Sequence, residues 1–292
     1  MRRGITAELA GLTVGDGRPV AVIGVVNVSP ESFHPGSVYR GEEAIVRAAL
    51  AMVDAGAALI DVGARSTAPY LDTDVDEATE AGRLAHAVET LAAKLSVPVS
   101  ADTSRPGPAR AALEAGARVI NDVSTLRDPG LARLVAEHSA GLILMAAPAR
   151  LEGASGRRRP PTDSGRPSPA TLVKRLLGAG LRRAAQARIP RERIVVDPGI
   201  GFFRDQVLSW DAWDVCVLAD LRALLALGRP LCVGVSRKSF IGAIVDRAAT
   251  SERLAGSLAA TTIAVMNGAA LIRTHDVGET RDAVRVAERV RR

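Results

Sequence analysis

The chain has 292 residues, of which 47% are hydrophobic and 24% charged, a balance that excludes a disordered protein and predicts a large packed core. Its net charge of +6 would suit a nucleic-acid partner, but Phe, Tyr and Trp make up only 3% of the residues and do not interleave with the arginines, so we expect none. No apolar run reaches the ~18 residues that a membrane span needs, so we expect a cytoplasmic protein without a membrane partner. Its positive charge suits small phosphorylated substrates.

Short runs rich in Val and Ile alternate along the chain with longer segments of helical periodicity. Residues 1–19 precede the first run, and we expect them to form a hairpin that caps the bottom of the fold. In chain order, the predicted strands are Val20–Val28, Leu59–Val62, Val99–Asp102, Val119–Asp122, Leu142–Met145, Ile194–Asp197, Leu231–Val235 and Leu271–Thr274. The helical patterns that follow them are Glu42–Ala55, Val75–Leu95, Gly107–Ala115, Pro129–Glu137, Thr171–Ala187, Trp210–Leu227, Ser251–Asn267 and Glu279–Arg291.

Eight β-then-α units with apolar strands predict an α/β protein with a parallel sheet covered by helices. The count favours a closed sheet, so residues 1–292 are expected to form a single domain, a (β/α)8 TIM barrel. Residues 146–169, rich in Pro, Gly and Ser and carrying Arg157, Arg158 and Arg159, break the pattern as a long loop that we expect to be mobile. Cys216 and Cys232 have neither metal-ligand nor disulfide spacing and are expected to be inert buried thiols.

Polar residues stand at the ends of nearly all of these strands, where the chemistry of a barrel is located. In strand order, they are Asn27; Asp61 with Ser66 and Thr67; Asp102 and Thr103; Asn121 and Asp122; Asp197; Ser236, Arg237 and Lys238; and Arg273, His275 and Asp276, with Met145 ending the fifth strand. Any single aspartate after a strand can equally be a helix cap or a turn residue.

The strand ends nevertheless fall into two chemical sets. Carboxylates, an amide and an ammonium suited to a flat heterocycle with an amidine-like edge are supplied by Asp102, Asn121, Asp197 and Lys238. Donors suited to a phosphate or pyrophosphate are supplied by Asn27, Ser66, Thr67, Arg273 and His275. No carboxylate–histidine cluster has the spacing of a structural zinc site. A Mg²⁺ ion held mostly by a pyrophosphate would need only one or two protein oxygens, and Asn27 could give one of them.

Seven segments of the chain resemble, in the same order, the motifs of the dihydropteroate synthase family, the pterin-binding TIM barrels. They are GVVNVSPESF (Gly24–Phe33), IDVGARST (Ile60–Thr67), VSADT (Val99–Thr103), INDVS (Ile120–Ser124), DPGIGF (Asp197–Phe202), GVSRKSFIG (Gly234–Gly242) and RTHDV (Arg273–Val277). The resemblance implies a transferase that condenses 6-hydroxymethyl-7,8-dihydropterin diphosphate with an arylamine, p-aminobenzoate or a larger aminobenzene derivative. Pyrophosphate is released, and the reaction belongs to the biosynthesis of folate or a related pterin cofactor.

The resemblance also implies roles for individual residues. The pterin would be bound by Asp102, Asn121, Met145, Asp197 and Lys238, and the diphosphate by Asn27, Ser66, Thr67, Arg273 and His275. The arylamine would be bordered by Phe33, Thr67, Pro69, Phe202 and Ser239. Catalysis would fall to Asp102, Lys238, Arg273 and His275, with Mg²⁺ as the cofactor on Asn27 and a homodimer formed through outer helices.

The chain departs from the family pattern on the arylamine side. The family's loop glycine–glutamate–serine–threonine–arginine–proline is GARSTAP at residues 63–69, so that Arg65 replaces the glutamate and Ala68 the arginine. The methionine–histidine–methionine after the fifth strand is MAA at residues 145–147, and the later glycine–lysine is Phe203-Arg204. The first loop, HPGSVY at residues 34–39, lacks the usual serine–aspartate–glycine character.

Two interpretations of these departures stay open. One is a larger acceptor, such as the ribofuranosyl aminobenzene phosphate of methanopterin-type cofactors, in contact with Arg65, Arg204 and Tyr39 or Tyr70. The other is neutral drift in loops around ordinary p-aminobenzoate.

Two other functions compete with the synthase interpretation. A pterin-dependent methyltransferase has no diphosphate to bind, so the intact segment Arg273–Val277 argues against it. A non-catalytic pterin-binding homologue would be expected to have lost Asn27, Arg273 or His275, and all three are present.

Overall fold

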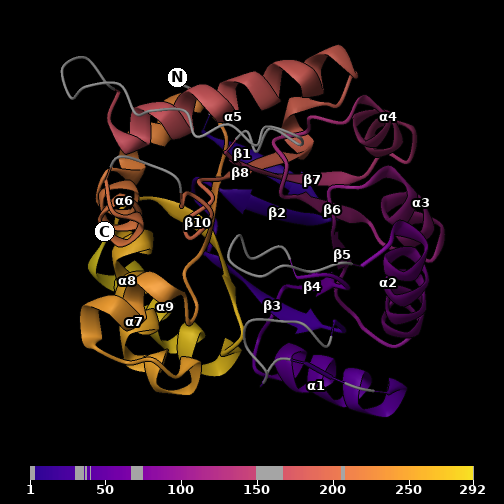
Figure 1. The fold of residues 1–292 in the computed structure, drawn as a ribbon, viewed down its shortest axis with the longest axis horizontal. Coiled ribbons are helices and arrows are strands. Elements are labelled where there is room, and N and C mark those ends of the chain that lie inside the picture. The colour runs from indigo at the N-terminus through magenta and orange to yellow at the C-terminus, as the bar shows by residue number, and fades with distance from the viewer. Residues whose placement is uncertain are drawn as a thin grey trace.

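Eight parallel strands close into a barrel with a ring of helices outside it (Figure 1). The computed structural model describes residues 4–29, 36, 38–39, 41–66, 75–148, 167–204 and 208–291. Around the barrel, hydrogen-bonded neighbours run in the order β10 (Ala269–Thr274), β3 (Ala21–Asn27), β4 (Leu59–Gly63), β5 (Val99–Asp102), β6 (Val119–Asp122), β7 (Gly141–Met145), β8 (Ile194–Asp197) and β9 (Leu231–Gly234). The predicted single TIM barrel is confirmed.

The helices follow the strands as the β-then-α pattern predicts. They are α1 (Glu42–Asp54), α2 (Glu77–Ala92), α3 (Pro106–Glu114), α4 (Pro129–Glu137), α5 (Pro169–Gln186), α6 (Trp210–Ala219), α7 (Ser239–Val245), α8 (Leu254–Met266) and α9 (Val277–Val290). Side chains fix where several of them begin, since Asp76, Asp128 and Ser168 each accept a hydrogen bond from a backbone N–H in the first turn of α2, α4 and α5. In the described part of the chain, no helix is both long and apolar enough to cross a membrane.

The N-terminal residues form the predicted hairpin and close the bottom of the barrel. Strands β1 (Thr6–Leu9) and β2 (Leu12–Gly15) pair antiparallel. Leu9 and Val14 are fully buried and pack in one cluster with Ile23, Leu59 and Val195 near the amino ends of the barrel strands. The hairpin therefore seals the lower end with apolar side chains, and only the opposite end is left for polar chemistry.

Three differences from the predicted elements have local causes. The pattern at Trp210–Leu227 is two helices, α6 and the 3-10 helix Leu221–Leu227, and the pattern at Ser251–Asn267 is the 3-10 helix Thr250–Arg253 followed by α8. Helix α7 was not predicted, because seven residues are too few to show a helical period. Of the long loop expected at 146–169, residues 149–166 lie outside the described part of the chain, and α5 begins at Pro169.

Candidate active site

The polar residues gather at the upper end of the barrel because a strand turns alternate side chains inward. Leu59, Val119 and Leu271 fill the lower barrel, and two residues further along the same strands stand Asp61, Asn121 and Arg273. The same spacing separates Val195 from Asp197 and Ile143 from Met145. On these strands, the side chains that point into the barrel are thus apolar near the bottom and, except for Met145 of β7, polar near the top.

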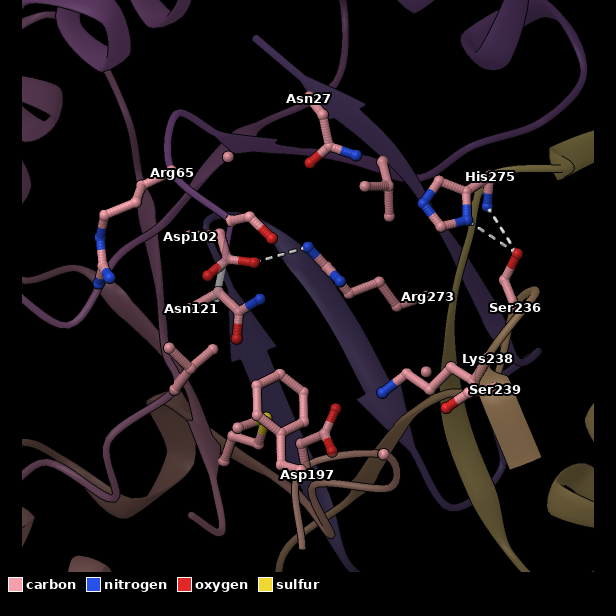
Figure 2. Close-up of a pocket in the computed structure, with 18 of the residues that line it drawn as sticks. Asn27, Arg65, Asp102, Asn121, Asp197, Ser236, Lys238, Ser239, Arg273 and His275 are labelled. Carbon is pink, nitrogen blue, oxygen red and sulfur yellow. Dashed lines mark hydrogen bonds and ion pairs between the residues drawn. The ribbon is translucent and has the colours of Figure 1, made fainter. Parts of the chain in front are cut away.

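These side chains surround a cavity of about 950 Å³ that opens to solvent (Figure 2). All predicted site residues that the structure describes line it, namely Asn27, Ser66, Asp102, Asn121, Met145, Asp197, Phe202, Lys238, Ser239, Arg273 and His275. Phe33, Thr67 and Pro69, predicted for the arylamine side, lie outside the described residues. The sequence pattern therefore brought both chemical sets to one place.

Arg273 lies at the centre of this cavity and joins two carboxylates. Its Nε donates to Asp61 Oδ2 at 2.5 Å and its Nη2 to Asp102 Oδ2 at 2.7 Å (Figure 2 shows the second bond). Burial alone would lower the pKa of the Arg273 guanidinium, but the two carboxylates outweigh burial and raise that pKa. Arg273 therefore stays charged, and the two carboxylates hold this positive charge at the centre of the cavity.

The two acids that bind Arg273 each keep one oxygen available. Within the described part of the chain, Asp61 Oδ1 and Asp102 Oδ1 are buried and accept no hydrogen bond. Burial raises the pKa of Asp102 to about 7, because its effect exceeds the opposing influence of Arg273. A buried acceptor without a donor is costly, so the arrangement favours a ligand that brings N–H groups to the Asp102 side.

Asp197 is held by the turn that follows β8. Its Oδ1 accepts a hydrogen bond from Gly199 N at 2.7 Å, and burial raises the pKa of its carboxyl. Gly199 has a φ of 71°, and a Cβ there would stand 2.1 Å from the carbonyl oxygen of Ala146. Only glycine fits, and this turn carries Gly201 and Phe202 into the wall of the cavity.

Lys238 reaches across the cavity to the same turn (Figure 2). Its Nζ donates to the carbonyl oxygen of Ile200 and lies 5.0 Å from the centre of the Phe202 ring. Burial lowers the pKa of Lys238 to about 8, while the carboxylates of Asp197 and Asp214 act in the opposite direction. The ammonium is thus poised to lose a proton only slightly above neutral pH.

His275 occupies the far side of the cavity from Asp102 (Figure 2). Its Nδ1 is 3.0 Å from Ser236 Oγ, and its backbone N–H donates to the same oxygen at 3.3 Å. Beside it, Arg237 makes two bonds to Asp276, Nε to Oδ2 at 2.8 Å and Nη2 to Oδ1 at 2.6 Å. The loops after β9 and β10 are therefore tied together, and the imidazole is oriented by Ser236.

Comparisons with known proteins agree with this geometry. The family described as pterin binding enzyme matches residues 23–275. The dihydropteroate synthase of Escherichia coli K12 is 37% identical over 271 residues, which are 91% of this chain and 90% of that protein, and the Mycobacterium leprae enzyme is 37% identical over 92% of both chains. The chain belongs to the dihydropteroate synthase family.

Solved structures of the same family extend the similarity to the whole fold. The Xanthomonas albilineans dihydropteroate synthase solved with 4-aminobenzoic acid is 36% identical and superposes with a TM-score of 0.83, over 99% of this chain and 98% of that one. The Yersinia pestis dihydropteroate synthase, solved with a sulfonamide drug, gives a TM-score of 0.84 at 33% identity.

Arg65, in the loop after β4, pairs with a buried carboxylate of α2. Arg65 Nε donates to Glu80 Oε2 at 3.0 Å, and Arg105 Nη1 donates to the same oxygen at 3.0 Å. Glu80 is 1% exposed, and its other oxygen accepts from Thr103 Oγ1 at 2.6 Å. Arg65 lines the cavity but directs its guanidinium away from the centre (Figure 2).

Arg204 replaces the family's lysine and belongs to the cavity itself. Its Nη2 donates to Ser239 Oγ at 2.5 Å, and its guanidinium lies 4.3 Å from the centre of the Trp210 ring. Tyr39, the other predicted contact of a larger acceptor, does not line this cavity but an adjoining groove beside Asp276, and Tyr70 lies outside the described residues.

Two residues of the site were not assigned from the sequence. Asp61 was noted at a strand end, but the structure makes it the partner of both Arg273 and Asn121, whose Nδ2 donates to Asp61 Oδ2 at 2.9 Å. Asp214 of α6 was not noted; its Oδ1 accepts from Gly201 N at 2.8 Å, and burial raises its pKa to about 6. A charged residue within an apolar strand was the available signal for Asp61, whereas nothing in the sequence of α6 distinguished Asp214.

Proposed function

We propose that the protein is a dihydropteroate synthase that joins 6-hydroxymethyl-7,8-dihydropterin diphosphate to p-aminobenzoate and releases pyrophosphate. The observation that carries this proposal is the pairing of Arg273 with Asp61 and Asp102 inside a cavity that also holds Asp197, Lys238 and His275. Family relatives support it, because the Xanthomonas albilineans enzyme was solved with 7,8-dihydropteroate and with 4-aminobenzoic acid.

The pterin ring would lie between the acids of β5 and β8. Asp197 Oδ2 and Asp102 Oδ1 are acceptors for the ring's amino and N–H groups, and Asn121 offers an amide beside them. With a pKa raised to about 7, Asp102 holds or releases a proton near neutral pH as charge changes on the adjacent ring. Lys238 adds a donor on the opposite side of the same ring.

The departing diphosphate would bind at the cationic side of the cavity. Arg273 and His275 line it together with Ser66, so a guanidinium and an imidazole face the leaving group. Their donors stabilise the negative charge that grows on the diphosphate oxygen as its bond to the pterin methylene breaks. The amine of the acceptor then forms the new bond to that methylene, held in place by the pterin pocket.

Mg²⁺ is the cofactor that we propose for the diphosphate. Asn27 lines the cavity with a side-chain oxygen suited to such a hard cation, and one protein oxygen is enough when phosphate oxygens supply most of the ligands. Among the described residues, no group of three or more His, Cys, Asp or Glu could hold a metal ion, which agrees with a cation held mainly by substrate. When bound, Mg²⁺ would neutralise charge on the leaving diphosphate.

The acceptor proposed is an arylamine with a carboxylate. Phe202 offers an aromatic face in the cavity wall, and Arg204 bound to Ser239 offers a guanidinium and a hydroxyl for the carboxylate. A 4-aminobenzoate ring has this combination of flat apolar surface and terminal anion. The phosphorylated acceptor of methanopterin-type cofactors is the competing interpretation, and the assay below distinguishes the two.

We also propose that the protein acts as a cytoplasmic homodimer. Ile244 and Val245 of α7 and Ile263 of α8 are exposed apolar side chains on helices that lie on one side of the barrel (Figure 1). Burying them against a second copy would remove this apolar surface from water. Cys216 and Cys232 are both free thiols, which supports a reducing compartment.

The proposed reaction is tested by measuring pyrophosphate release from dihydropterin diphosphate with Mg²⁺ and each acceptor separately. We expect turnover with p-aminobenzoate and at least about tenfold lower kcat/KM with the ribofuranosyl aminobenzene phosphate. Arg273→Ala should lower kcat/KM by about 100-fold or more, because it removes the guanidinium proposed to face the diphosphate and leaves the buried carboxylates of Asp61 and Asp102 without their cationic partner. Tight pterin binding without turnover on any amine would refute the synthase assignment.

A further inference from the structure

A second pocket lies on the outer layer between α5 and the start of α4 with the loop before it, and the two helices are neighbours in Figure 1. It spans about 820 Å³, a volume that includes open solvent, and it shares no lining residue with the active-site cavity. Four of its lining residues are arginines, Arg127, Arg133, Arg183 and Arg188. The other described residues that line it are apolar or neutral, and none of them is an aspartate or glutamate.

Two of these arginines are fixed in place before any ligand arrives. Arg127 Nη2 donates to the carbonyl oxygen of Ala147 at 2.8 Å, and Arg183 Nη1 donates to that of Thr125 at 2.9 Å. Each guanidinium keeps other N–H groups for a ligand, because the fork carries five donors and these bonds use one each. The pocket is therefore preorganised, and binding would not have to order these two side chains.

Like charges lie close together here. Burial and the charge of Arg183 both lower the pKa of Arg127, and the carboxylate of Asp122 acts in the opposite direction without reversing that shift. Within the described part of the chain, none of the four arginines is in an ion pair.

The two nearest acids in the sequence are engaged elsewhere. Asp128 Oδ1 accepts from the backbone N–H groups of Gly130 and Leu131 at the start of α4. Asp122 is buried and accepts hydrogen bonds from Ser124 and from the backbone of Leu126. Among the described residues, positive charge at the pocket thus outweighs the influence of Asp122, and an anion from outside the chain would balance it.

We propose that this pocket binds the phosphate or diphosphate group of a small molecule. Guanidinium groups match phosphate oxygens in pairs, and a compact dianion would relieve the repulsion between Arg127 and Arg183. The small side chains of Ala132 and Ala187 leave room for such an anion between the two helices, and Gln186 beside them is neutral. The site is separate from the catalytic cavity, so this inference does not depend on the proposed reaction.

The test is calorimetric titration of the full chain with inorganic pyrophosphate in metal-free buffer at low salt. We expect two independent binding sites per chain. The double variant Arg133→Gln/Arg188→Gln should weaken one of them by at least about tenfold and leave the other unchanged. Arg133 and Arg188 make no side-chain hydrogen bond or ion pair within the described part of the chain, so the fold is expected to be retained.

Two controls make the result decisive. Arg182→Gln removes an exposed arginine of α5 that does not line the pocket, and it should leave both sites intact. Arg273→Gln should weaken the catalytic site alone, which assigns each binding event to its location. Pyrophosphate binding that the double variant leaves unchanged, whether the unaltered protein shows one site or two, would overturn the proposal, and so would an equal loss in Arg182→Gln.

Discussion

Replacing Asp61 by asparagine tests whether the acid hidden beneath the cavity organises the site. Asp61 is fully buried, and its Oδ2 accepts bonds from Arg273 Nε and Asn121 Nδ2. Asparagine has the same shape but no charge, so Arg273 would keep only Asp102 as a charged partner. We expect the guanidinium to become less well placed, while the barrel around it stays packed.

The size of the effect follows from the contacts. Breaking a fully buried ion pair costs about 3–5 kcal/mol, but Arg273 keeps Asp102 and its side chain is 22% exposed, so the loss should be nearer to about 2 kcal/mol. If the same amount is lost from transition-state binding, kcat/KM for the pterin diphosphate falls about 30-fold. The melting temperature should fall by about 3 °C for a chain of this size.

Pyrophosphate release and thermal unfolding measure the two effects of Asp61→Asn on one protein sample. Glu42→Gln is the matched control, because it removes the carboxylate of an exposed pair with Lys94, 2.9 Å apart, and should leave kcat/KM and the melting temperature nearly unchanged. If Asp61→Asn retains the kcat/KM of the unaltered enzyme, Asp61 does not organise Arg273 and the reasoning is wrong.

Two further changes probe the lysine and the divergent loop. In Asp214→Asn the amide still accepts from Gly201 N, but the negative charge that favours protonated Lys238 is gone; the pKa of Lys238 should therefore drop below about 8, and the alkaline limb of the kcat/KM profile should move to lower pH. An unmoved limb would show that Lys238 does not set it. Ala68→Arg restores the family's loop arginine, and we expect a changed ratio of kcat/KM between p-aminobenzoate and larger amines; an identical ratio and rate would mean that the loop's divergence does not affect acceptor choice.

The barrel could be predicted from the sequence because each strand is a short apolar run of its own. Strands β5, β6 and β8 have the predicted bounds, since a polar residue ends each apolar run at Asp102, Asp122 and Asp197. Helix α7 escaped prediction because Ser239–Val245 is too short for a period to appear. The boundary inside Trp210–Leu227 escaped because the apolar pattern continues across the change from α-helix to 3-10 helix.

The sequence predicts at which end of the barrel the candidate site's residues gather, but it does not predict which of these residues pair with each other. Asp61 and Arg273 are charges within otherwise apolar inward faces, and buried charges of opposite sign are expected to find each other. Their strands, β4 and β10, are not neighbours in the barrel, because β3 lies between them. The contact therefore depends on the closed geometry and on the length of the arginine side chain, which no local pattern in the sequence encodes.

The same reasoning bears on the acceptor. Arg65 directs its guanidinium away from the centre of the cavity, because its Nε donates to Glu80, a buried carboxylate whose only other cationic partner in the described part of the chain is Arg105. Turning the whole Arg65 guanidinium towards a phosphate in the cavity would break that bond at a cost of about 1.5–3 kcal/mol, the usual contribution of a hydrogen bond to a charged group. Arg204 needs no such rearrangement to face the cavity, because it already lines it and donates to Ser239. One accessible guanidinium beside one hydroxyl suits a carboxylate better than a phosphate ester, which supports p-aminobenzoate as the substrate.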